Sequence, residues 1–271
     1  MQDSIASALS LDSVSCTFPG RDGVPYTAVR EASVAVADGE FVSLVGPTGC
    51  GKSTLLNVAA GLLAPGAGEV SVFGRRLTGL NRHAGYLFQT DALLPWRTAL
   101  DNVALGLQLR STPKGESAAR ANDWLRRVGL AAHRGKYPHE LSGGMRKRVA
   151  LAQTLILDPK MLLMDEPFSA LDVQTRSLME NELLGLWSQD RKSVLFVTHD
   201  LEEAISLSDR VVVLSAGPAS RPIAEFAIDL PRPRDVAEIR LTPRFVELHT
   251  TIWQALREEV LKTYAQEESA A

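Results

Sequence analysis

The chain has 271 residues and a formal net charge of -3, with a pI of about 6.0, so it lacks the bulk positive charge that binds nucleic acid. Its composition, 45% hydrophobic and 23% charged, is ordinary for a globular protein and supplies ample material for a core. No stretch approaches about eighteen apolar residues, so we expect no segment that spans a membrane.

The cysteines and the N-terminus indicate the cellular compartment. Cys16 and Cys50 are isolated and do not make a disulfide framework, which favours a reduced, cytosolic setting. Residues 1–5 lack the basic start and the apolar core of a signal peptide. Any role at a membrane is therefore expected to come through a partner.

Short strands dominate the N-terminal part of the chain. Apolar and polar residues alternate over 9–18, and a second strand is expected at 33–36. Residues 41–45 form an apolar run suited to a buried strand, and further strands are expected at 69–73 and 85–88. Together these segments predict an antiparallel β layer beside an α/β core.

Residues 46–54 read GPTGCGKST, which matches the G-x-x-x-x-G-K-S pattern of a phosphate-binding loop. A strand before the loop and a helix over 52–60 give it the expected context, which disfavours a chance glycine-rich turn. The glycines allow backbone N–H groups to point at a phosphate, and the helix start adds partial positive charge. Lys52 is expected to reach the β- and γ-phosphates, and the Ser53 hydroxyl to bind Mg²⁺.

Helices replace strands after Gln89. A capping box opens an apolar helix over 98–109, and an amphipathic helix is expected over 116–128. A third helix follows the glycines at 143–144 and ends at 157. We therefore expect residues 89–158 to form a helical insertion within the α/β core.

The core pattern resumes after this insertion. Strands are expected at 161–166, 193–198 and 210–214, with helices at 172–187 and 201–207. Strands that alternate with helices predict a mainly parallel sheet, which binds ligands at the carboxyl ends of its strands. Because Gly46, Asp165 and His199 each follow a strand, we expect them to meet in one crevice.

The tail, residues 231–271, is rich in Pro and Arg and then helical. Its apolar residues at helical spacing are Phe245, Leu248, Ile252, Leu256 and Val260. This pattern favours a helix packed on the core over a separate binding module.

The residues expected at the crevice suit phosphoryl chemistry. Asp165 is the acid needed beside Ser53 to hold Mg²⁺, usually through water. Glu166 can orient a water for in-line attack, and adjacent buried acids are costly without a cation or proton. A lone histidine is more often structural, but these acids favour a γ-phosphate contact for His199. Gln89 could sense metal or water.

Residues 141–145 read LSGGM and suggest a second anion site. Ser142 is an N-cap, and Gly143 and Gly144 expose backbone N–H groups at a helix start. Simple capping is the alternative. A phosphate loop in the core and an anion site on a helical lobe suggest that two copies pair head to tail, each offering Ser142 to the other's ATP.

Together these motifs resemble the ATP-binding cassette family, the ATPase subunits of ABC transporters, over residues 9–230. The resemblance assigns 46–54 to the Walker A motif, Gln89 to the Q-loop, 141–145 to the signature motif, 161–166 to the Walker B strand, 169–172 to the D-loop and His199 to the switch histidine. Met145 stands where the family usually has Gln, with the Ser-Gly-Gly intact. Phe18 fits the family's adenine-stacking aromatic, and Tyr26 is the weaker candidate.

The resemblance implies a complete set of site residues. The catalytic set is Glu166, His199, Gln89 and Lys52, and the metal set is Ser53, Gln89 and Asp165. The ATP-binding set is Phe18, Gly46, Pro47, Thr48, Gly49, Cys50, Gly51, Lys52, Ser53, Thr54, Gln89, Ser142, Gly143, Gly144 and Asp172.

The implied fold is an α/β P-loop NTPase (RecA-like) core with an antiparallel β subdomain and a helical subdomain insertion. One cassette domain would cover 1–271: a core at 1–88 and 159–230, a helical subdomain at 89–158 and a C-terminal extension at 231–271. Two cassettes would close on two ATP molecules, and a permease would convert that motion into transport. The implied location is peripheral, at the cytoplasmic face of the inner membrane, with a solute-binding protein as an indirect partner and no nucleic acid.

The stretch 90–97 is apolar and interrupted by Pro95. Leu93, Leu94 and Trp96 could belong to the core of the helical lobe, but the family docks its permease near here, so we expect partner contact. Residues 94–98, LPWRT, look like the importer branch for nitrate, sulfonate, taurine or bicarbonate.

Two other classes of protein compete with this interpretation. A cassette ATPase of translation or DNA repair is disfavoured because the chain has one phosphate loop, no long heptad insertion and no marked basic surface. A P-loop kinase or GTPase would leave residues 141–145 and 169–172 unexplained.

Overall fold

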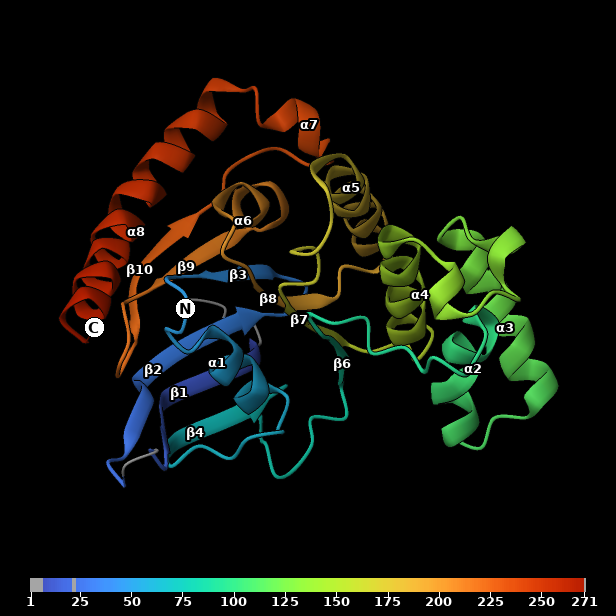
Figure 1. Ribbon diagram of the computed structural model, residues 1–271, viewed down its shortest axis with the longest axis horizontal. Coiled ribbons are helices and arrows are strands. Elements are labelled where there is room, and N and C mark those ends of the chain that lie inside the picture. Colours follow the sequence, from blue (N-terminus) through green and yellow to red (C-terminus); the bar gives the residue numbers. More distant parts are fainter. Residues whose placement is uncertain (1–6, 21–22, 271) are drawn as a thin grey trace, which may run out of the picture.

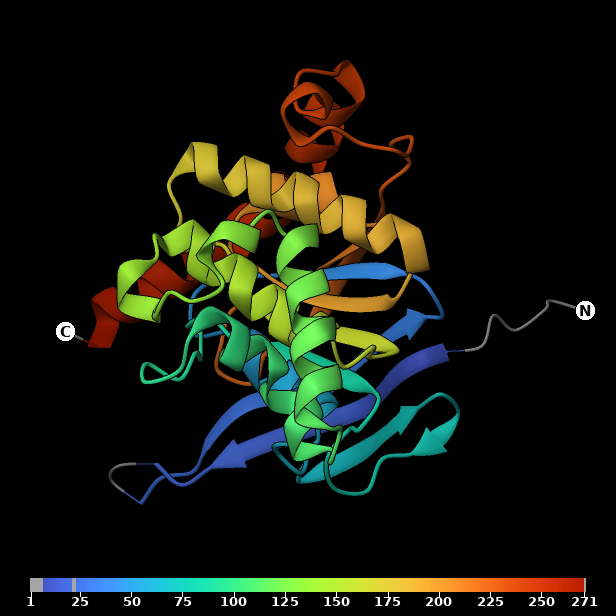
Figure 2. The same cartoon turned by 90° about the vertical axis from the view of Figure 1, so that its right-hand side faces the viewer.

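The computed structural model describes residues 7–20 and 23–270. Two sheets pack together, and a group of helices projects from the side (Figures 1 and 2). The expectation about residues 1–5 concerns residues outside the described ranges. Within those ranges, no helix combines the length and the apolar character needed to cross a membrane.

The central sheet has six strands in the order β10-β9-β3-β8-β7-β6. Their bounds are β3 Phe41–Val45, β6 Ala84–Leu87, β7 Met161–Asp165, β8 Ser193–Val197, β9 Arg210–Leu214 and β10 Pro222–Ala227. All neighbouring pairs are parallel except β10 with β9, which is antiparallel. The parallel arrangement expected from the sequence is confirmed, whereas β10, a half-exposed edge strand, was not predicted.

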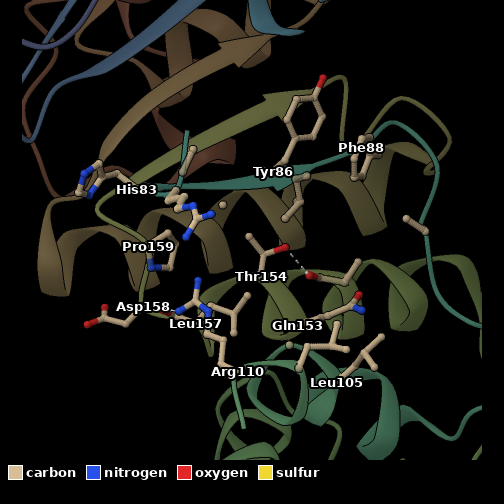
Figure 3. Close-up of a pocket in the computed structure, with 18 of the residues that line it drawn as sticks. His83, Tyr86, Phe88, Leu105, Arg110, Gln153, Thr154, Leu157, Asp158 and Pro159 are labelled. Atoms are coloured by element: carbon tan, nitrogen blue, oxygen red, sulfur yellow. Dashed lines mark hydrogen bonds between the residues drawn. The ribbon is translucent and has the colours of Figure 1, made fainter. Parts of the chain in front are cut away.

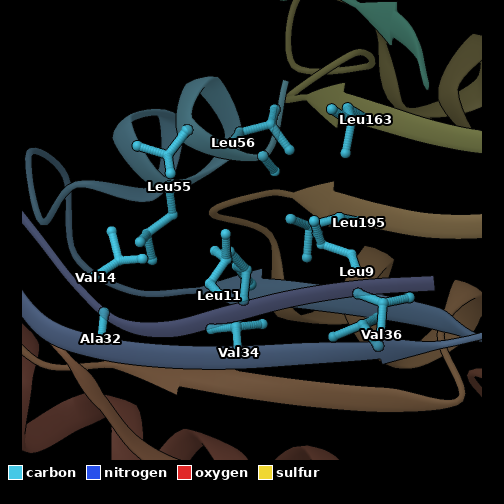
Figure 4. Packing of buried hydrophobic residues seen from close by; sticks show 14 of the residues in the cluster. Leu9, Leu11, Val14, Ala32, Val34, Val36, Leu55, Leu56, Leu163 and Leu195 are labelled. Atoms are coloured by element: carbon cyan, nitrogen blue, oxygen red, sulfur yellow. The ribbon is translucent and has the colours of Figure 1, made fainter. Parts of the chain in front are cut away.

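The second sheet has the order β2-β1-β4-β5, and its paired strands are antiparallel. Its strands are β1 Ser7–Phe18, β2 Tyr26–Ala37, β4 Ala67–Val72 and β5 Arg75–Arg76, and helix α1 (Lys52–Ala59) packs between the two sheets. Figure 4 shows Leu55 and Leu56 of α1 among side chains of both sheets, including Leu11 and Leu195. This packing fixes α1, and with it the loop at its N-terminus.

Helices cover the other face of the central sheet. They are α5 (Val173–Asp190), α6 (Leu201–Leu207), α7 (Val236–Ile239) and α8 (Pro243–Ala270). Along β7, Leu162 and Met164 pack towards α5, whereas Met161 and Leu163 face α1, as expected for alternating side chains. The tail helix α8 packs on the core through the predicted apolar face, which includes Ile252.

The projecting helices have a core of their own. They are α2 (Ala99–Leu109), α3 (Lys114–Arg127) and α4 (Gly143–Leu155), with single 3₁₀ turns at Ala131–His133 and Pro138–Glu140. Val103, Leu125 and Val149 are buried between them. The predicted cap is present, because the Thr98 hydroxyl accepts a hydrogen bond from the Asp101 N–H at 3.2 Å. Helix α3 begins at Lys114, two residues earlier than expected, with Pro113 as its N-cap.

Arg234 joins the tail to the core. Its side chain is buried, and its guanidinium donates hydrogen bonds of 2.7–3.3 Å to the carbonyl oxygens of Ile205, Ser206, Ser208, Ile228 and Leu230. Burial lowers the pKa of Arg234 to about 10, so the group remains charged at neutral pH. One guanidinium group therefore supplies hydrogen bonds to backbone carbonyl oxygens at the end of α6 and after β10.

We expect Arg234→Met to lower the free energy of unfolding by about 3 kcal/mol, because buried carbonyl groups would lose their charged donor. Urea titration followed by circular dichroism measures this change. Arg257→Met is the matched control, since Arg257 lies exposed on α8, and its effect should be within about 0.5 kcal/mol. Equal stability of the two variants would contradict the proposed role of Arg234.

Candidate functional site

A cavity of about 520 Å³ lies where the ends of β7 and β8 meet the phosphate loop. Its lining residues are Phe18, Tyr26, Ala28, Thr48, Gly49, Gly51, Lys52, Ser53, Thr54, Gln89, Asp165, Glu166 and His199. Most of the site residues named from the sequence therefore meet in one place. Gly46, Pro47 and Cys50 belong to the same loop but are buried beneath its surface.

The shape of the loop requires glycine. Gly51 has a φ of +95°, and a Cβ there would lie 2.6 Å from Val29 Cγ1. A Cβ on Gly46 would lie 2.8 Å from the Sγ of Cys50, whose thiol is fully buried. Helix α1 begins directly after Gly51 with no side-chain cap, so its first N–H groups are available to an anion.

Lys52 lies against the loop. Its Nζ donates hydrogen bonds to the carbonyl oxygens of Gly46 at 2.8 Å and Pro47 at 2.9 Å. Its side chain also lines the cavity. The ammonium group is therefore held by the loop that would surround a phosphate, as the sequence pattern requires.

Ser53 and Asp165 place two oxygen ligands side by side. Ser53 Oγ donates to Asp165 Oδ1 at 2.9 Å, and burial raises the pKa of Asp165. Hydroxyl and carboxylate oxygens suit Mg²⁺. Among the described residues, no group of three or more His, Cys, Asp or Glu side chains could hold a metal.

Glu166 and His199 contact each other in the lining of the cavity. Glu166 Oε2 and His199 Nδ1 are 2.9 Å apart. Glu166 has a φ of 43°, a left-handed conformation that costs an ordinary residue about 1 kcal/mol or more. Hydrogen bonds hold this conformation, because the Glu166 N–H donates to the Val197 carbonyl at 2.8 Å and its own carbonyl accepts from Ser169 Oγ at 3.0 Å.

A buried polar network supports the segment that carries His199. Thr198 Oγ1 donates to Glu203 Oε2 at 2.6 Å and accepts from the Asp200 N–H at 2.9 Å. Arg176 pairs with Asp200 at 2.8 Å and donates to the Leu171 carbonyl at 3.3 Å. The network therefore joins the segment around His199 to residues 169–172. Sequence reasoning missed Arg176 and Glu203, although a glutamate among the apolar residues of α6 was a signal for a buried partner.

The signature residues lie outside this cavity. Ser142 caps α4 and accepts from the Met145 N–H at 3.3 Å, and Asp172 caps α5 in the same manner. A Cβ on Gly144 would lie 2.5 Å from Thr175 Cγ2, so glycine permits the close approach of α4 to α5. Met145 packs against the core of the helical part, which consists of α2, α3 and α4. Within one chain, Ser142 and Asp172 are therefore not among the residues that line the nucleotide cavity.

Both aromatic candidates border the cavity. Phe18 ends β1 and Tyr26 begins β2, and the two residues are paired across the strands. Tyr26 Oη also donates to the Gly49 carbonyl at 3.5 Å. Both rings are therefore placed where they can contact a planar base.

Comparisons with known proteins match most of the chain. A family model described as ABC transporter matches residues 29–169. An uncharacterized ABC transporter ATP-binding protein of Methanocaldococcus jannaschii is 46% identical over 89% of each chain. A taurine import ATP-binding protein of Pseudomonas aeruginosa is 42% identical over 94% of this chain and 96% of the relative. A nitrate import ATP-binding protein of Synechococcus elongatus is 40% identical over 93% of this chain and 38% of the relative.

Two solved structures of ABC cassettes are also similar to this chain. A dimeric bacterial ABC transporter cassette is 31% identical with a TM-score of 0.73. A dimeric ATP-binding cassette in a post-hydrolysis state, bound to ADP and Pi, is 30% identical with a TM-score of 0.72. Each match covers 82% of this chain and 100% of the other. The expected α/β fold is confirmed.

The buried network predicts a pH dependence of stability. Burial raises the pKa of Glu203 from 4.5 to about 7. The folded state favours the protonated form of Glu203. The contribution of this group to the free energy of unfolding is therefore fully present below about pH 4.5 and is lost as the pH rises through about 7. As the pH rises from about 5 to about 8, the free energy of unfolding of Glu203→Gln should increase by about 2 kcal/mol relative to that of the unmodified chain.

Thermal or urea unfolding across this pH range measures the difference between the two proteins. The control is Glu258→Gln, because Glu258 lies exposed on α8. Its stability should run parallel to that of the unmodified chain. A parallel curve for Glu203→Gln as well would show that Glu203 has no raised pKa.

Proposed function

The chain belongs to the ABC transporter family, and from this premise we propose that it is the ATP-hydrolysing subunit of a small-solute importer. The convergence of the phosphate loop, Asp165, Glu166 and His199 around one cavity is the main support. Two such cassettes would bind and hydrolyse ATP, and a separate permease would convert their motion into transport. Relatives named as import subunits favour this function over a role in translation or DNA repair.

Each side chain at the cavity has a proposed role in hydrolysis. The loop N–H groups and Lys52 would bind the β- and γ-phosphates. Ser53 and Asp165, with Gln89, would hold Mg²⁺, which would neutralise charge that develops on the phosphates. Glu166 would orient the attacking water, and His199, 2.9 Å from Glu166, would contact the γ-phosphate.

The remaining site residues are proposed to act between two copies of the chain. The N-terminus of α4, at residues 142–144, does not line the chain's own cavity, and neither does Asp172, the N-cap of α5. In a head-to-tail dimer this group would close the partner's nucleotide site. The dimeric form of two related solved structures supports this arrangement. Phe18 would stack on adenine, with Tyr26 beside it.

A second cavity offers a place for the permease. It has a volume of about 450 Å³ and lies between β6 and the helices α2 and α4 (Figure 3). Its apolar lining includes Phe88, Leu105, Leu109 and Leu157. We propose that a cytoplasmic helix of the permease inserts into this groove. Because the groove lies between the core and α4, movement of either part would change its shape.

The stretch 90–97 divides between the two interpretations considered from the sequence. Leu93 packs against the core of the helical part, as the core alternative predicts. Trp96 is 70% exposed, so it is not a core residue. Asp91 and Ala92 line the second cavity, the one proposed for the permease. Contact of Trp96 with a permease stays a proposal.

The relatives also support a proposal for the solute and the location. Because relatives at 40–42% identity are named for taurine and nitrate import, we propose a small anion or zwitterion of that type. A solute-binding protein would deliver it on the other side of the membrane. The chain would lie at the cytoplasmic face of the inner membrane, held by the permease, with no nucleic-acid partner.

We expect Glu166→Gln to bind ATP but to hydrolyse it about 100-fold more slowly or worse, because the water would lose its general base. The variant should accumulate as a dimer in ATP, measured by size-exclusion chromatography and phosphate release. Glu116→Gln, an exposed position on α3, is the control. Turnover of Glu166→Gln at the normal rate would remove the assigned role.

The importer function predicts that the chain purifies from its source membranes with a polytopic permease, which mass spectrometry would identify. Leu109→Glu should weaken this association while ATP binding persists, because Leu109 is 77% exposed in the groove. Leu241→Glu, at 84% exposure after α7, should retain the permease. Recovery of ribosomes or repair factors alone would overturn the transport function and leave the ATPase function in place.

A further inference from the structure

The loop between β9 and β10, residues 215–221, lies beside the nucleotide cavity. A Cβ on Gly217 would lie 3.4 Å from the Gly49 carbonyl oxygen and 3.7 Å from Cys50 Cα, both in the phosphate loop. The same Cβ would lie 3.6 Å from Tyr26 Oη. Gly49 and Tyr26 line the cavity. The backbone at residue 217 is therefore packed next to two parts of the cavity wall.

Backbone hydrogen bonds attach the same loop to β2. The Ala219 N–H donates to the Thr27 carbonyl oxygen at 2.7 Å. The Ser220 N–H donates to the Ala28 carbonyl oxygen at 3.1 Å, and Ala28 lines the cavity. Thr27 directly follows Tyr26 in the chain. The position of the loop therefore also affects the start of β2, where a planar base can be contacted.

A buried carboxylate of the tail helix holds the beginning of this loop. Only 7% of the Glu259 side chain is exposed, and its Oε2 accepts a hydrogen bond from the Ala216 N–H at 2.7 Å. Its Oε1 accepts from Lys262 Nζ at 2.5 Å. A buried carboxylate is costly to leave without partners. The hydrogen bond therefore fixes Ala216 relative to α8.

Helix α8 is itself attached to the central sheet. Ile252 and Leu256 of α8 belong to one apolar cluster with Val211 and Val213 of β9, and the helix runs beside β9 and β10 in Figure 1. Glu259 follows Leu256 by three residues, which places it on the same face of the helix. The carboxylate is therefore presented to the loop by a helix that cannot withdraw without opening the core.

We infer that Glu259 is a positioning residue through which the tail helix sets the affinity of the nucleotide site. It holds residues 215–221 against the phosphate loop and Tyr26, and so stabilises their nucleotide-binding conformation. This inference rests on the proposed function, in which these groups bind ATP. Glu166 and His199 are not part of this series of contacts. The rate of the chemical step should therefore depend little on Glu259.

The test is Glu259→Met in the full chain, with ATP binding measured by isothermal titration calorimetry and Mg-ATP hydrolysis measured over a range of ATP concentrations. Methionine fills a similar volume but lacks the carboxylate that accepts from the Ala216 N–H. We expect Kd and KM for ATP to rise about 3- to 10-fold, as the loss of one supporting hydrogen bond would cause. The change in kcat should be less than about twofold.

Two variants separate the hydrogen bond to Ala216 from the charge of the carboxylate. Glu259→Gln retains an acceptor oxygen and should bind ATP with nearly the normal Kd. Lys262→Met removes the ion pair, leaves the acceptor in place and should also change Kd little. Glu258→Met is the matched control, because Glu258 is the exposed neighbour on α8 and should bind ATP normally.

A normal Kd in a folded Glu259→Met protein would overturn the inference, as would a fall in kcat with Kd unchanged. If Glu259→Met does not fold, Glu259→Asp keeps the charge but is one methylene group shorter than the side chain that contacts Ala216. It should raise Kd in the same direction, and a normal Kd in this variant would again overturn the inference.

Amide hydrogen exchange separates failure of this inference from failure of the proposed function. In Glu259→Met, exchange at residues 215–220 should accelerate while exchange in β7 stays unchanged. Unchanged exchange at 215–220 would contradict the attachment, whatever the affinity for ATP. Absence of ATP binding by the unmodified chain would overturn the proposed function and leave the exchange result as the test of the attachment.

Discussion

The packing of α1 between the two sheets is the constraint on which the nucleotide site depends. An anion can be bound by backbone N–H groups only if the helix that carries them cannot withdraw. Leu55 and Leu56 anchor α1 among side chains of both sheets, and the glycines before it allow the loop to turn over the strand end. Among the described residues, no strand of the antiparallel sheet is paired with a strand of the central sheet. The antiparallel sheet contributes the apolar surface that holds this helix in place, and it also contributes Phe18 and Tyr26, which border the nucleotide cavity.

Two basic side chains, Arg176 and Lys147, connect segments that lie around the nucleotide cavity. Arg176 joins the segment around His199 to residues 169–172, so groups that face different nucleotides in the proposed dimer share one buried network. Lys147 joins Gln89 to α4. Both connections use a long basic side chain against backbone carbonyls and carboxylates, which transmits position because neither partner can be left unpaired in the interior. The apolar core fixes where the nucleotide binds, and these ion pairs link the segments around it.

Local patterns predicted the parts of the fold that depend on local chemistry. The alternation of strands and helices, the Thr98 cap and the apolar face of α8 are all present, because each is set by residues close in sequence. The edge strand β10 was missed because its side chains are only half buried and give a weak pattern. Arg176 and Lys147 were missed because Asp200 and Gln89, their partners, are distant in the chain, and spacing does not reveal such pairs. The expected motif residues at the cavity do meet there, whereas their catalytic roles and the domain boundaries stay predictions.

The buried thiol beneath the phosphate loop has a consequence for chemical resistance. Thiol oxidation and alkylation proceed through the thiolate. Burial raises the pKa of Cys50, and the side chain is enclosed below Gly46. The loop therefore carries a sulfur atom as a small apolar filler that reagents can reach only if the loop opens. Bound phosphate would hold the loop closed, so modification of Cys50 would report the time that the nucleotide site spends unfolded locally.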